Sequence, residues 1–421
     1  MRKGSGRGDE ERRRARRRRR AAARRRSPVL SALTSSALAL PGLAGGARAA
    51  SPVDRVGADY NFSYYAEDDL PSGKLAAGDD SRYEIEMHQF HAVAPLGERS
   101  DANLDIVHET MSGATPWYVA NSGSGTPIQV MTGATVDEKR TDALLTGSYY
   151  FERAKASASG GFSLENDYFS GNGGLSGDLD LNDKNTTLSA GGSLSFDTIE
   201  PTDAALFATR PTKEKKETYS AFAGISQVIR RNIAVQSTFS YQHGTGYLSD
   251  PYKQVEVAGN ANNPDRRPGQ RNQFAWLTRY RHHVSPVEGT LHANYQLYLD
   301  DWGITSHTLE LAWHQTLFDA FRLVPAFRYY SQSQADFYAP FFSAPAQHMS
   351  SDYRLSPYGA ISWKLRAEVE LQDWPGKLDW RGSFTWERYL SGGEYALQSV
   401  SLENPGLVSF NLFTIALTGR F

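Results

Sequence analysis

The 421-residue sequence contains no cysteine. Disulfides, thiolate metal sites and covalently attached c-type haem are therefore excluded. Beyond its amino-terminal segment the chain also lacks any run of about 18 apolar residues, so a helical membrane protein is not expected. The sequence has no Gly-x-Ser-x-Gly, His-Glu-x-x-His or phosphate-loop motif. These absences leave no common catalytic motif from which to infer an activity.

Positive charge is scarce outside the first residues of the chain. Residues 1–49 hold 15 Lys and Arg against three Asp and Glu, so the other 372 residues have a net charge of −14. An acidic body of this kind argues against binding to nucleic acid. The chain is instead rich in aromatic residues, which make up 12% of it, and in glycine, with 37 residues. Both favour strands and aromatic belts at a membrane interface over a helical fold.

The amino-terminal segment has the three parts of a secretory signal peptide. An Arg-rich stretch from Arg12 to Arg26 is followed by the moderately apolar residues 27–43 and then by Ala47-Arg48-Ala49, a small-residue cleavage site. The sequence thus predicts a signal peptide at residues 1–49 and a mature protein at residues 50–421. The basic part is longer than usual, which leaves open a translation start downstream of Met1.

Period-two alternation of apolar and polar residues recurs along the mature chain and marks sixteen candidate strands. In one of them the apolar set alternates with the polar set, as in Trp380, Phe384 and Trp386 against Arg381, Thr385 and Glu387. This pattern fits a soluble β-sandwich. It fits equally a barrel whose apolar face meets lipid and whose polar face lines a lumen.

The connections separate these two architectures, because short and long ones largely alternate. The short ones lie at 152–154, 182–185, 230–232, 285–288, 319–320 and 373–376, and the longer ones at 67–80, 113–140, 197–217, 246–270, 335–350 and 391–405. Two exceptions are a short outer turn near Asp301–Gly303 and a tight glycine-rich turn at Asn172–Gly174. Short turns on one side and long loops on the other are typical of outer-membrane barrels. We therefore predict an all-β fold, an antiparallel transmembrane β-barrel of about sixteen strands with short periplasmic turns and long extracellular loops.

The carboxy-terminal segment supports this prediction. Phe413, Ile415, Leu417 and Phe421 fall on one face of a strand that ends the chain. This strand resembles the closing strand of bacterial outer-membrane barrels, and the resemblance implies that the barrel-assembly machinery recognises Phe421. Gly419 departs from the pattern, since a larger apolar residue is usual at that position.

Charged residues on the polar faces of the strands are candidates for the lining of the lumen. Asp178 and Asp180 share a face, as do Glu84 and Glu86. The basic candidates are Arg279, Arg281, Lys364 and Arg366. A porin-like channel would use such side chains to select ions. The alternative interpretation is that they only solvate a wet interior.

A near-repeat within residues 111–135 is the most unusual motif. Met111-Ser-Gly-Ala-Thr115 recurs twenty residues later as Met131-Thr-Gly-Ala-Thr135. One interpretation is that both limbs of an extracellular arm use small residues to pack closely. The other is a flavin site, because the motif is similar to the core at which a flavin transferase esterifies FMN to Thr in sodium-pumping quinone oxidoreductases. Thr115 and Thr135 would then be the acceptors, and Trp117 and Tyr118 would be candidates to stack on the isoalloxazine ring.

Several segments together resemble one known family. They are YNFSYYAEDDLP at 60–71, RYEIEMHQFH at 82–91, HETMSGATPWY at 108–118, PIQVMTGAT at 127–135, ENDYF at 165–169 and NDKNTTL at 182–188. Over nearly all of its mature length the chain is similar to a proteobacterial family named only as domain of unknown function 3570. The resemblance implies an outer-membrane barrel of no established activity. It also implies an association with a periplasmic flavin transferase, because genes of that family tend to lie near one.

Function has several interpretations at this point. We expect a lipid-embedded channel or conduit in the outer membrane of a Gram-negative bacterium, without enzymatic activity, and we weigh a link through covalent FMN to envelope electron transfer. The alternatives are a barrel enzyme, for which His243 near Ser240 is the only candidate pair, a structural or receptor barrel without transport, and a soluble sandwich receptor. A calcium-binding pattern is matched in part by Asp178, Asp180, Asn182 and Asp183.

Overall fold

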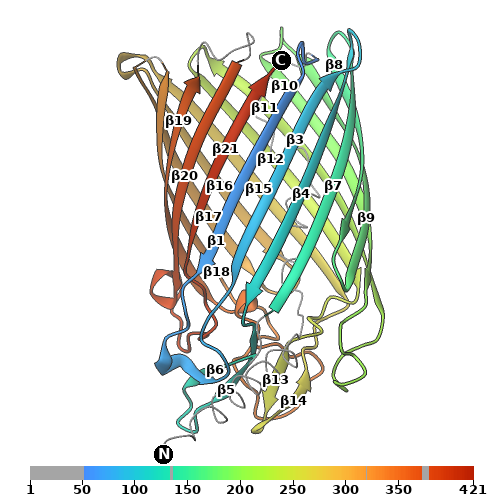
Figure 1. Ribbon diagram of the computed structural model, residues 1–421, viewed down its shortest axis with the longest axis vertical. Coiled ribbons are helices and arrows are strands. Elements are labelled where there is room, and N and C mark those ends of the chain that lie inside the picture. Colours follow the sequence, from blue (N-terminus) through green and yellow to red (C-terminus); the bar gives the residue numbers. More distant parts are fainter. Residues whose placement is uncertain (1–51, 133–135, 319, 372–378) are drawn as a thin grey trace, which may run out of the picture.

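Sixteen antiparallel strands close into a barrel in the computed structural model (Figure 1). The structure describes residues 52–132, 136–318, 320–371 and 379–421, so the predicted signal peptide lies outside the described residues. In ring order the barrel strands are β1 (Gly57–Glu67), β21 (Phe410–Arg420), β20 (Asp379–Gly392), β19 (Tyr358–Leu371), β18 (Phe321–Gln332), β17 (Thr305–Leu317), β16 (Gly289–Asp300), β15 (Gln270–Val284), β12 (Ile233–Gly246), β11 (Glu214–Arg230), β10 (Thr186–Ile199), β9 (Tyr168–Leu181), β8 (Ala154–Leu164), β7 (Val136–Tyr150), β4 (Ser100–Gly113) and β3 (Glu84–Pro95). The predicted fold class and strand number are thereby confirmed.

The first and last barrel strands close the ring. β1 pairs with β21 from Gly57↔Arg420 to Glu67↔Phe410. The start of β1 and the end of β21 therefore lie at the same end of the barrel, which we call the turn end and which is uppermost in Figure 1. We call the opposite end the loop end. Closure leaves no strand edge unpaired, as a barrel in lipid requires.

Short and long connections divide between the two ends as the sequence predicts. The described turn-end connections, such as residues 151–153, 182–185 and 231–232, are short, whereas residues 68–83, 114–135, 247–269, 333–357 and 393–409 connect strands at the loop end. The predicted tight turn at Asn172–Gly174 is wrong. These residues lie inside β9, and the turn from β8 to β9 is made by residues 165–167. Glycine-rich strand and glycine-rich turn look alike in a sequence because both lack bulky side chains.

The loop-end connections carry secondary structure of their own. Two small sheets form there, one from β2 (Leu75–Ala77), β6 (Pro127–Met131) and β5 (Pro116–Asn121), the other from β13 (Gln254–Val257) and β14 (Asn260–Pro264). The 3₁₀ turns η2 (Ser72–Lys74), η4 (Tyr353–Leu355) and η5 (Gly393–Tyr395) lie in the same region, and η3 (Ser285–Val287) lies at the turn end. In the described part of the chain, no helix is long and apolar enough to cross a membrane.

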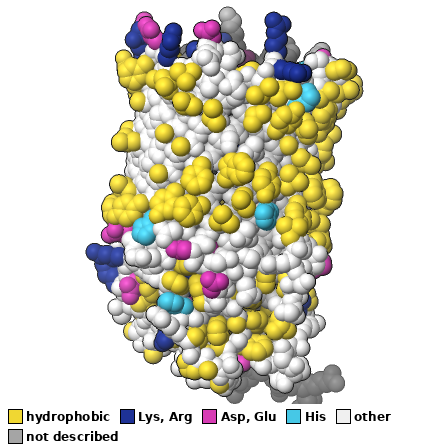
Figure 2. Space-filling view, turned by 180° about the vertical axis from the view of Figure 1, so that it is seen from behind, with side chains coloured by type: hydrophobic (Ala, Val, Ile, Leu, Met, Phe, Trp, Pro, Cys, Tyr) yellow, Lys and Arg dark blue, Asp and Glu magenta, His cyan; other side chains and the backbone are white. Residues whose placement is uncertain are grey.

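The outer surface of the barrel is apolar over most of its height. Side chains exposed on it include Leu175 (71%), Phe239 (52%), Trp276 (48%), Trp363 (54%), Phe384 (48%) and Ile415 (59%). Figure 2 shows one side of this surface, with charged side chains of both signs at the turn-end rim, apolar side chains below them, and further Asp, Glu and His side chains toward the loop end. A continuous apolar belt of this kind is energetically tolerable only in contact with lipid.

One strand reverses the expected assignment of its faces. Glu84 and Glu86 were expected in the lumen, but both are exposed on the outer surface, while Ile85 is 7% exposed and packs inside with Tyr83 and Met111. These residues lie at the loop end of β3, beyond the apolar belt. The outer face there is polar and the inner face is covered by packed loops, so the usual distribution of polar and apolar residues is inverted.

The closing strand has the expected register, and the structure explains its glycine. Ile415, Leu417 and Phe421 are exposed on the outer surface. A Cβ at Gly419 would lie 2.9 Å from the ring of Trp380, its cross-strand partner. Trp380 in turn contacts Phe421 edge to face at 5.8 Å between ring centroids. Glycine at position 419 thus makes room for an aromatic pair at the turn-end rim.

Phe421→Ala is expected to lower the amount of assembled barrel. The substitution removes both the contact with Trp380 and the terminal aromatic residue that the assembly machinery is expected to recognise. The measurement is the fraction of heat-modifiable protein in the membrane. Phe151→Ala removes an aromatic residue exposed at 53% in a turn-end connection and serves as the matched control. Equal yields for the two variants would show that the last residue has no special role.

Candidate functional site

The inward faces of the barrel strands carry charges that are divided between two sides of the lumen. On β15, Phe274 and Trp276 point outward, so Arg279 and Arg281 point inward, and on β9 the outward Leu175 and Leu179 place Asp178 and Asp180 inside. What we call the acidic wall comprises Asp101, Asp105, Glu109, Glu138, Asp142, Asp178, Asp180 and Asp197, together with Arg140 and Lys155. What we call the basic wall comprises Arg279, Arg281, Arg322, Arg328, Lys364, Arg366 and Arg381, together with Glu310, Glu368, Glu370 and Glu387.

The two walls face each other. In the ring order β9 and β19 are eight strands apart, as are β7 and β17, and in a closed ring of sixteen such strands are opposite. The acidic wall lies on β4 and β7–β10, and the basic wall on β15 and β17–β20. The expected lumen positions of Asp178, Asp180, Arg279, Arg281, Lys364 and Arg366 agree with this arrangement. A solute in the lumen therefore meets opposite charges on its two sides.

Several charges of the basic wall neutralise one another locally. Glu368 accepts from Arg366 at 2.8 Å and from Arg322 at 3.1 Å, so one carboxylate is shared between two guanidinium groups. Lys364 pairs with Glu387 at 3.0 Å. Among the described residues Arg281 forms no ion pair, and it donates instead to the side-chain oxygen of Asn294 at 2.7 Å. The basic groups named here outnumber the carboxylates, so this section of the basic wall retains a net positive charge.

Two histidines on the same side of the lumen are in contact, and the sequence pattern does not predict that contact. The rings of His292 of β16 and His314 of β17 are in contact, with centroids 3.9 Å apart and an interplanar angle of 39°. Arg281 is the cross-strand partner of His292. The two histidines are 22 residues apart in sequence, and their contact depends on the register of two strands. Alternation alone gives the face of each ring and says nothing about its neighbour.

Other histidines of the barrel wall make hydrogen-bond contacts with neighbouring strands. His88 and His91 lie on opposite faces of β3: His88 hydrogen-bonds Tyr60 at 2.8 Å on the outer surface and His91 contacts Asp105 at 2.7 Å inside. His243 and Ser240 lie on opposite faces of β12, since His243 contacts Asn272 and the buried Ser240 points inward. They cannot act as a nucleophile and base together, so that enzymatic alternative loses its candidate pair.

Four buried carboxylates surround Arg140 in the part of the acidic wall nearest the loop end. Glu109, Glu138, Asp142 and Glu165 are between 1% and 8% exposed, and Arg140 is 2% exposed. Arg140 lies 2.7 Å from Asp142 and 3.8 Å from Glu165. Burial, opposed by Arg140 and reinforced by Asp167, Asp142 and Glu109, raises the pKa of Glu165 to about 8. Glu165 lies in the turn after β8, and it is therefore held protonated at neutral pH.

The packing around Glu165 is expected to weaken as pH rises. The folded pKa of about 8 exceeds the value of 4.5 for a free Glu, so stability is complete below about pH 4.5 and falls as the pH approaches and passes 8. Glu165→Gln should remove this dependence. Limited proteolysis at the loop end, compared between pH 6 and pH 9, measures it. Glu152→Gln, in an exposed turn at the other end, is the control; identical pH profiles for both variants would contradict the prediction.

The connections at the loop end pack together into what we call the cap. Lys253 of the β12–β15 connection donates to the carbonyl of Pro116 in the β4–β7 connection, although β8, β9, β10 and β11 separate the two hairpins in the ring. Ser351 donates to the carbonyl of Gln254 at 3.2 Å, and the Asn404 amide to the carbonyl of Ser351 at 3.0 Å. These contacts join loops from distant parts of the ring, so the cap crosses the mouth of the barrel.

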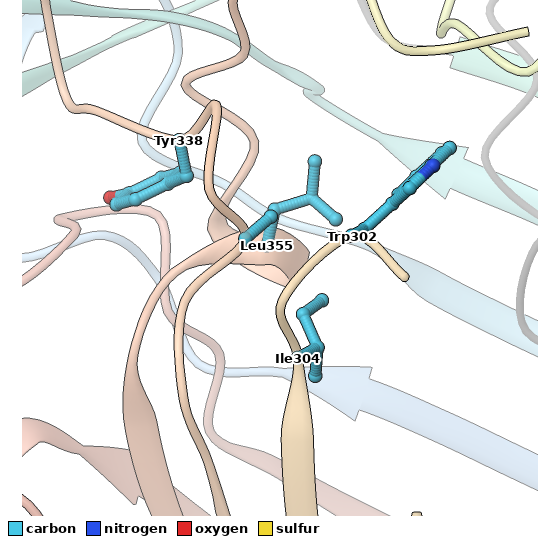
Figure 3. Close-up of a cluster of buried hydrophobic side chains, with 5 residues drawn as sticks. Trp302, Ile304, Tyr338 and Leu355 are labelled. Carbon is cyan, nitrogen blue, oxygen red and sulfur yellow. The ribbon is translucent and has the colours of Figure 1, made fainter. Parts of the chain in front are cut away.

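Apolar clusters hold parts of the cap together. Trp302, Ile304, Ala335, Tyr338 and Leu355 form one cluster, each less than 7% exposed. Figure 3 shows Tyr338, Leu355, Trp302 and Ile304 side by side, contributed by the β16–β17 and β18–β19 connections. The burial of large side chains away from the barrel wall indicates loops with a fixed conformation.

A buried ionic network, which we call the cap network, ties the same loops. Arg354 pairs with Asp250 at 2.7 Å and with Asp352, and Arg267 pairs with Asp265 at 2.7 Å and with Asp352 at 2.8 Å. Burial alone would raise the pKa of Asp352, but Arg354, Arg267 and Lys253 outweigh burial and hold that pKa well below its usual range. Burial lowers the pKa of Lys253. The ion pairs of the network thus join three aspartates to two arginines, and Lys253 adds a third basic group near Asp352.

The structure places three of the four predicted flavin residues, Thr115, Trp117 and Tyr118, within the cap. Thr115 is 2% exposed; its hydroxyl hydrogen-bonds the hydroxyl of Tyr83 at 2.5 Å, and its N–H donates to the hydroxyl of Thr132 at 2.9 Å. Trp117 and Tyr118 contact each other edge to face, with centroids 5.5 Å apart. Thr135 lies outside the described residues. Formation of an ester requires an accessible hydroxyl, and the Thr115 hydroxyl is buried in the folded protein.

The close-packing interpretation fits the first copy of the repeat. Gly113 has φ +132°, and a Cβ there would lie 2.2 Å from the carbonyl oxygen of Arg82. The N–H of Thr132 donates to the carbonyl of Thr115 at 2.9 Å, so the two limbs that carry the repeat lie side by side. Glycine is required because another backbone passes directly over it. Close packing thus accounts for the glycine of the first copy, whereas residues 133–135 of the second copy lie outside the described residues.

The partial calcium pattern is not supported. Asp178 and Asp180 accept hydrogen bonds from Ser189 at 2.6 Å and Thr187 at 2.8 Å, while Asn182 and Asp183 lie in the turn-end connection. Within the ranges that the structure describes, no group of three His, Asp or Glu side chains is arranged to hold a metal ion. The aspartates instead bind hydroxyl groups of the neighbouring strand.

Comparison with known proteins gives one family and a set of distant structural similarities. The family described as "Protein of unknown function (DUF3570)" matches residues 30–392. No curated protein matches the chain. Solved structures with a similar fold include a bacterial polysaccharide outer membrane secretin (10% identity, TM-score 0.47, covering 87% of this chain and 99% of that one) and CdiB from Acinetobacter baumannii (8%, 0.49, 87% and 60%). Pseudomonas aeruginosa OccD3 is also similar (10%, 0.44, 94% and 100%).

Proposed function

Because this chain belongs to the DUF3570 family, whose description assigns no activity, we propose a function from its own geometry: a conduit for small charged or polar solutes across the outer membrane. The observation that carries this proposal is the combination of an apolar outer belt with charged walls inside. Sixteen strands enclose a lumen too wide for side chains to fill, so such a barrel holds water. The cap narrows one mouth.

The orientation follows from the ends of the barrel. The start of β1, the end of β21 and the short turns all lie at the turn end. In outer-membrane barrels this end faces the periplasm. The cap then faces the outside of the cell. This placement agrees with the predicted signal peptide and with insertion by the barrel-assembly machinery through Phe421. Solutes enter the charged lumen from the periplasm and meet the cap last, or take the reverse path.

Localisation and permeability together test this proposal. The protein should fractionate with the outer membrane and migrate differently on gels with and without heating. Liposomes that contain it should swell in small neutral sugars faster than protein-free liposomes. Recovery of the folded protein from the soluble periplasm would end the proposal of a membrane barrel. Outer-membrane location without any permeability would favour the structural or receptor alternative.

The repeat supports a second candidate function, flavin-dependent electron transfer in the envelope. A periplasmic flavin transferase would attach FMN before the β4–β7 connection crosses the membrane. Trp117 and Tyr118, already in contact, offer an aromatic surface for a flavin ring. The burial of Thr115 weighs against that residue as an acceptor in the folded protein.

Co-expression with the neighbouring transferase is expected to leave Thr115 unmodified, because an FMN group there would disrupt its contacts with Tyr83 and Thr132. Mass spectrometry of the tryptic peptides carrying Thr115 and Thr135 makes the measurement, with Thr→Val variants as controls. The mass of FMN minus water on the Thr115 peptide of the assembled barrel would contradict the packing described above. Modification of neither peptide would remove the flavin hypothesis and leave close packing as the explanation of the repeat.

A further inference from the structure

The basic wall concentrates positive charge near the turn end. Arg281 lies three residues from the end of β15 at Val284, His292 three from the start of β16 at Gly289, and His314 three from the end of β17 at Leu317. All three therefore lie at a similar depth, just inside the mouth that the cap does not cover. A solute entering this mouth meets them before it reaches the cap.

These three side chains form one surface. Arg281 is directly opposite His292 across the β15–β16 pair, which places their Cβ atoms about 5 Å apart. The ring of His292 contacts the ring of His314, tilted by 39° with centroids 3.9 Å apart. All three are partly exposed to the lumen. A guanidinium fork and two imidazole rings are thus presented together on one patch of the wall.

The carboxylates near this surface leave its positive charge largely uncompensated. Glu368 is already shared by Arg322 and Arg366. Glu310 is the cross-strand partner of Asn294 and Arg328. Among the described residues, Arg281 forms no ion pair. No carboxylate of the described residues lies within ion-pair distance of the imidazole of His292 or His314. The surface therefore has donors and positive charge for an anion that enters from the lumen.

We propose that Arg281, His292 and His314 form an anion-binding site in the lumen for small solutes that carry a phosphate or carboxylate group. Arg281 offers a planar pair of N–H donors that matches either group, and the imidazoles donate further N–H bonds. Arg279, Arg322 and Arg366 add positive charge around the site. The acidic wall on the opposite side repels the anion toward it, so the site lies on one side of the passage.

This inference deepens the proposed conduit by naming the class of solute, but its test does not depend on conduction. The full mature chain in detergent is dialysed to equilibrium against radiolabelled inorganic phosphate. Wild type should bind phosphate saturably, and the Arg281→Gln/His314→Gln double variant should bind at least about tenfold more weakly, because it loses the guanidinium and one imidazole donor to the anion. Arg281→Lys, which retains the charge but not the fork, should be intermediate.

The control removes the same amount of charge or more from elsewhere in the lumen. Lys155→Gln/Arg381→Gln changes two inward cations on β8 and β20 and should leave phosphate binding within about twofold of wild type. Equal weakening in both double variants, or no saturable binding to wild type, would overturn the site. Phosphate binding by a barrel that conducts nothing would keep the site and refute the conduit. Conduction without phosphate binding would support the conduit and refute the anion-binding site. Heat-modifiable migration shows that each variant is folded.

Discussion

Phe384→Lys is expected to destabilise the barrel by about 2–4 kcal/mol, the cost of placing a charge on the lipid-facing surface near the membrane centre. Phe384 is 48% exposed on the outer face of β20, between Ala367 and Ile415 of the neighbouring strands. No water or counter-charge is available to a lysine there. The measurement is the free energy of unfolding in detergent or lipid, or the yield of assembled protein.

Thr385→Lys is the matched control, one residue further along the same strand. Thr385 points inward, where its cross-strand partners are Arg366 and Thr414. A lysine beside Arg366 should cost less than about 1 kcal/mol in a wet lumen while making the basic wall more positive. If the register of β20 were wrong by one residue, every side chain of the strand would lie on the opposite face, and the two results would be reversed. Failure of Thr385→Lys to fold, with a normal Phe384→Lys, would reveal that error.

Arg354→Met is expected to open the cap. The substitution leaves Asp250 and Asp352 buried without their shared guanidinium, and breaking a buried ion pair in this way costs about 3–5 kcal/mol. Among the residues that the structure describes, Asp352 then keeps only Arg267 as an ion-pair partner. We expect faster proteolysis of residues 246–270 and 333–357 and a conductance several-fold above wild type. The strands should remain paired, because the cap lies outside the barrel wall.

The control for the cap uses an exposed ion pair at the same end. Arg388 pairs with Asp68, and their side chains are 26% and 44% exposed. Arg388→Met should change stability by no more than about 1 kcal/mol, since a solvated pair contributes little. Similar proteolysis and conductance for the two variants would show that the buried network does not hold the cap closed.

The barrel itself could be predicted from the sequence because its rules are local. Alternation gives the face of each strand, and the alternation of short and long connections gives the two ends of the barrel. The failures occur where local rules conflict. Glu84 and Glu86 lie beyond the apolar belt, where polar residues face outward. Asn172–Gly174 lacks bulky residues but is a strand because its neighbours β8 and β10 pair with it.

The candidate sites were less accessible to sequence reasoning, because they depend on contacts between distant residues. His292 and His314 meet only through the register of two strands. The cap network joins Asp250 to Arg354 across 104 residues. Thr115 belongs to a predicted extracellular arm, and the cap buries it against Tyr83. The register between β16 and β17 would be enough to predict the contact between the two histidines. No local sequence pattern indicates how the loops pack.

Single-channel recording from planar lipid bilayers tests the central claim most directly. Purified full-length mature wild type and the Arg354→Met variant are compared in potassium chloride, under conditions that give heat-modifiable, folded protein for both. Wild type should give discrete conductance steps and the variant steps several-fold larger, because the lumen is water-filled and the cap restricts it. Folded, membrane-inserted protein that gives no conductance in either form would contradict a conduit.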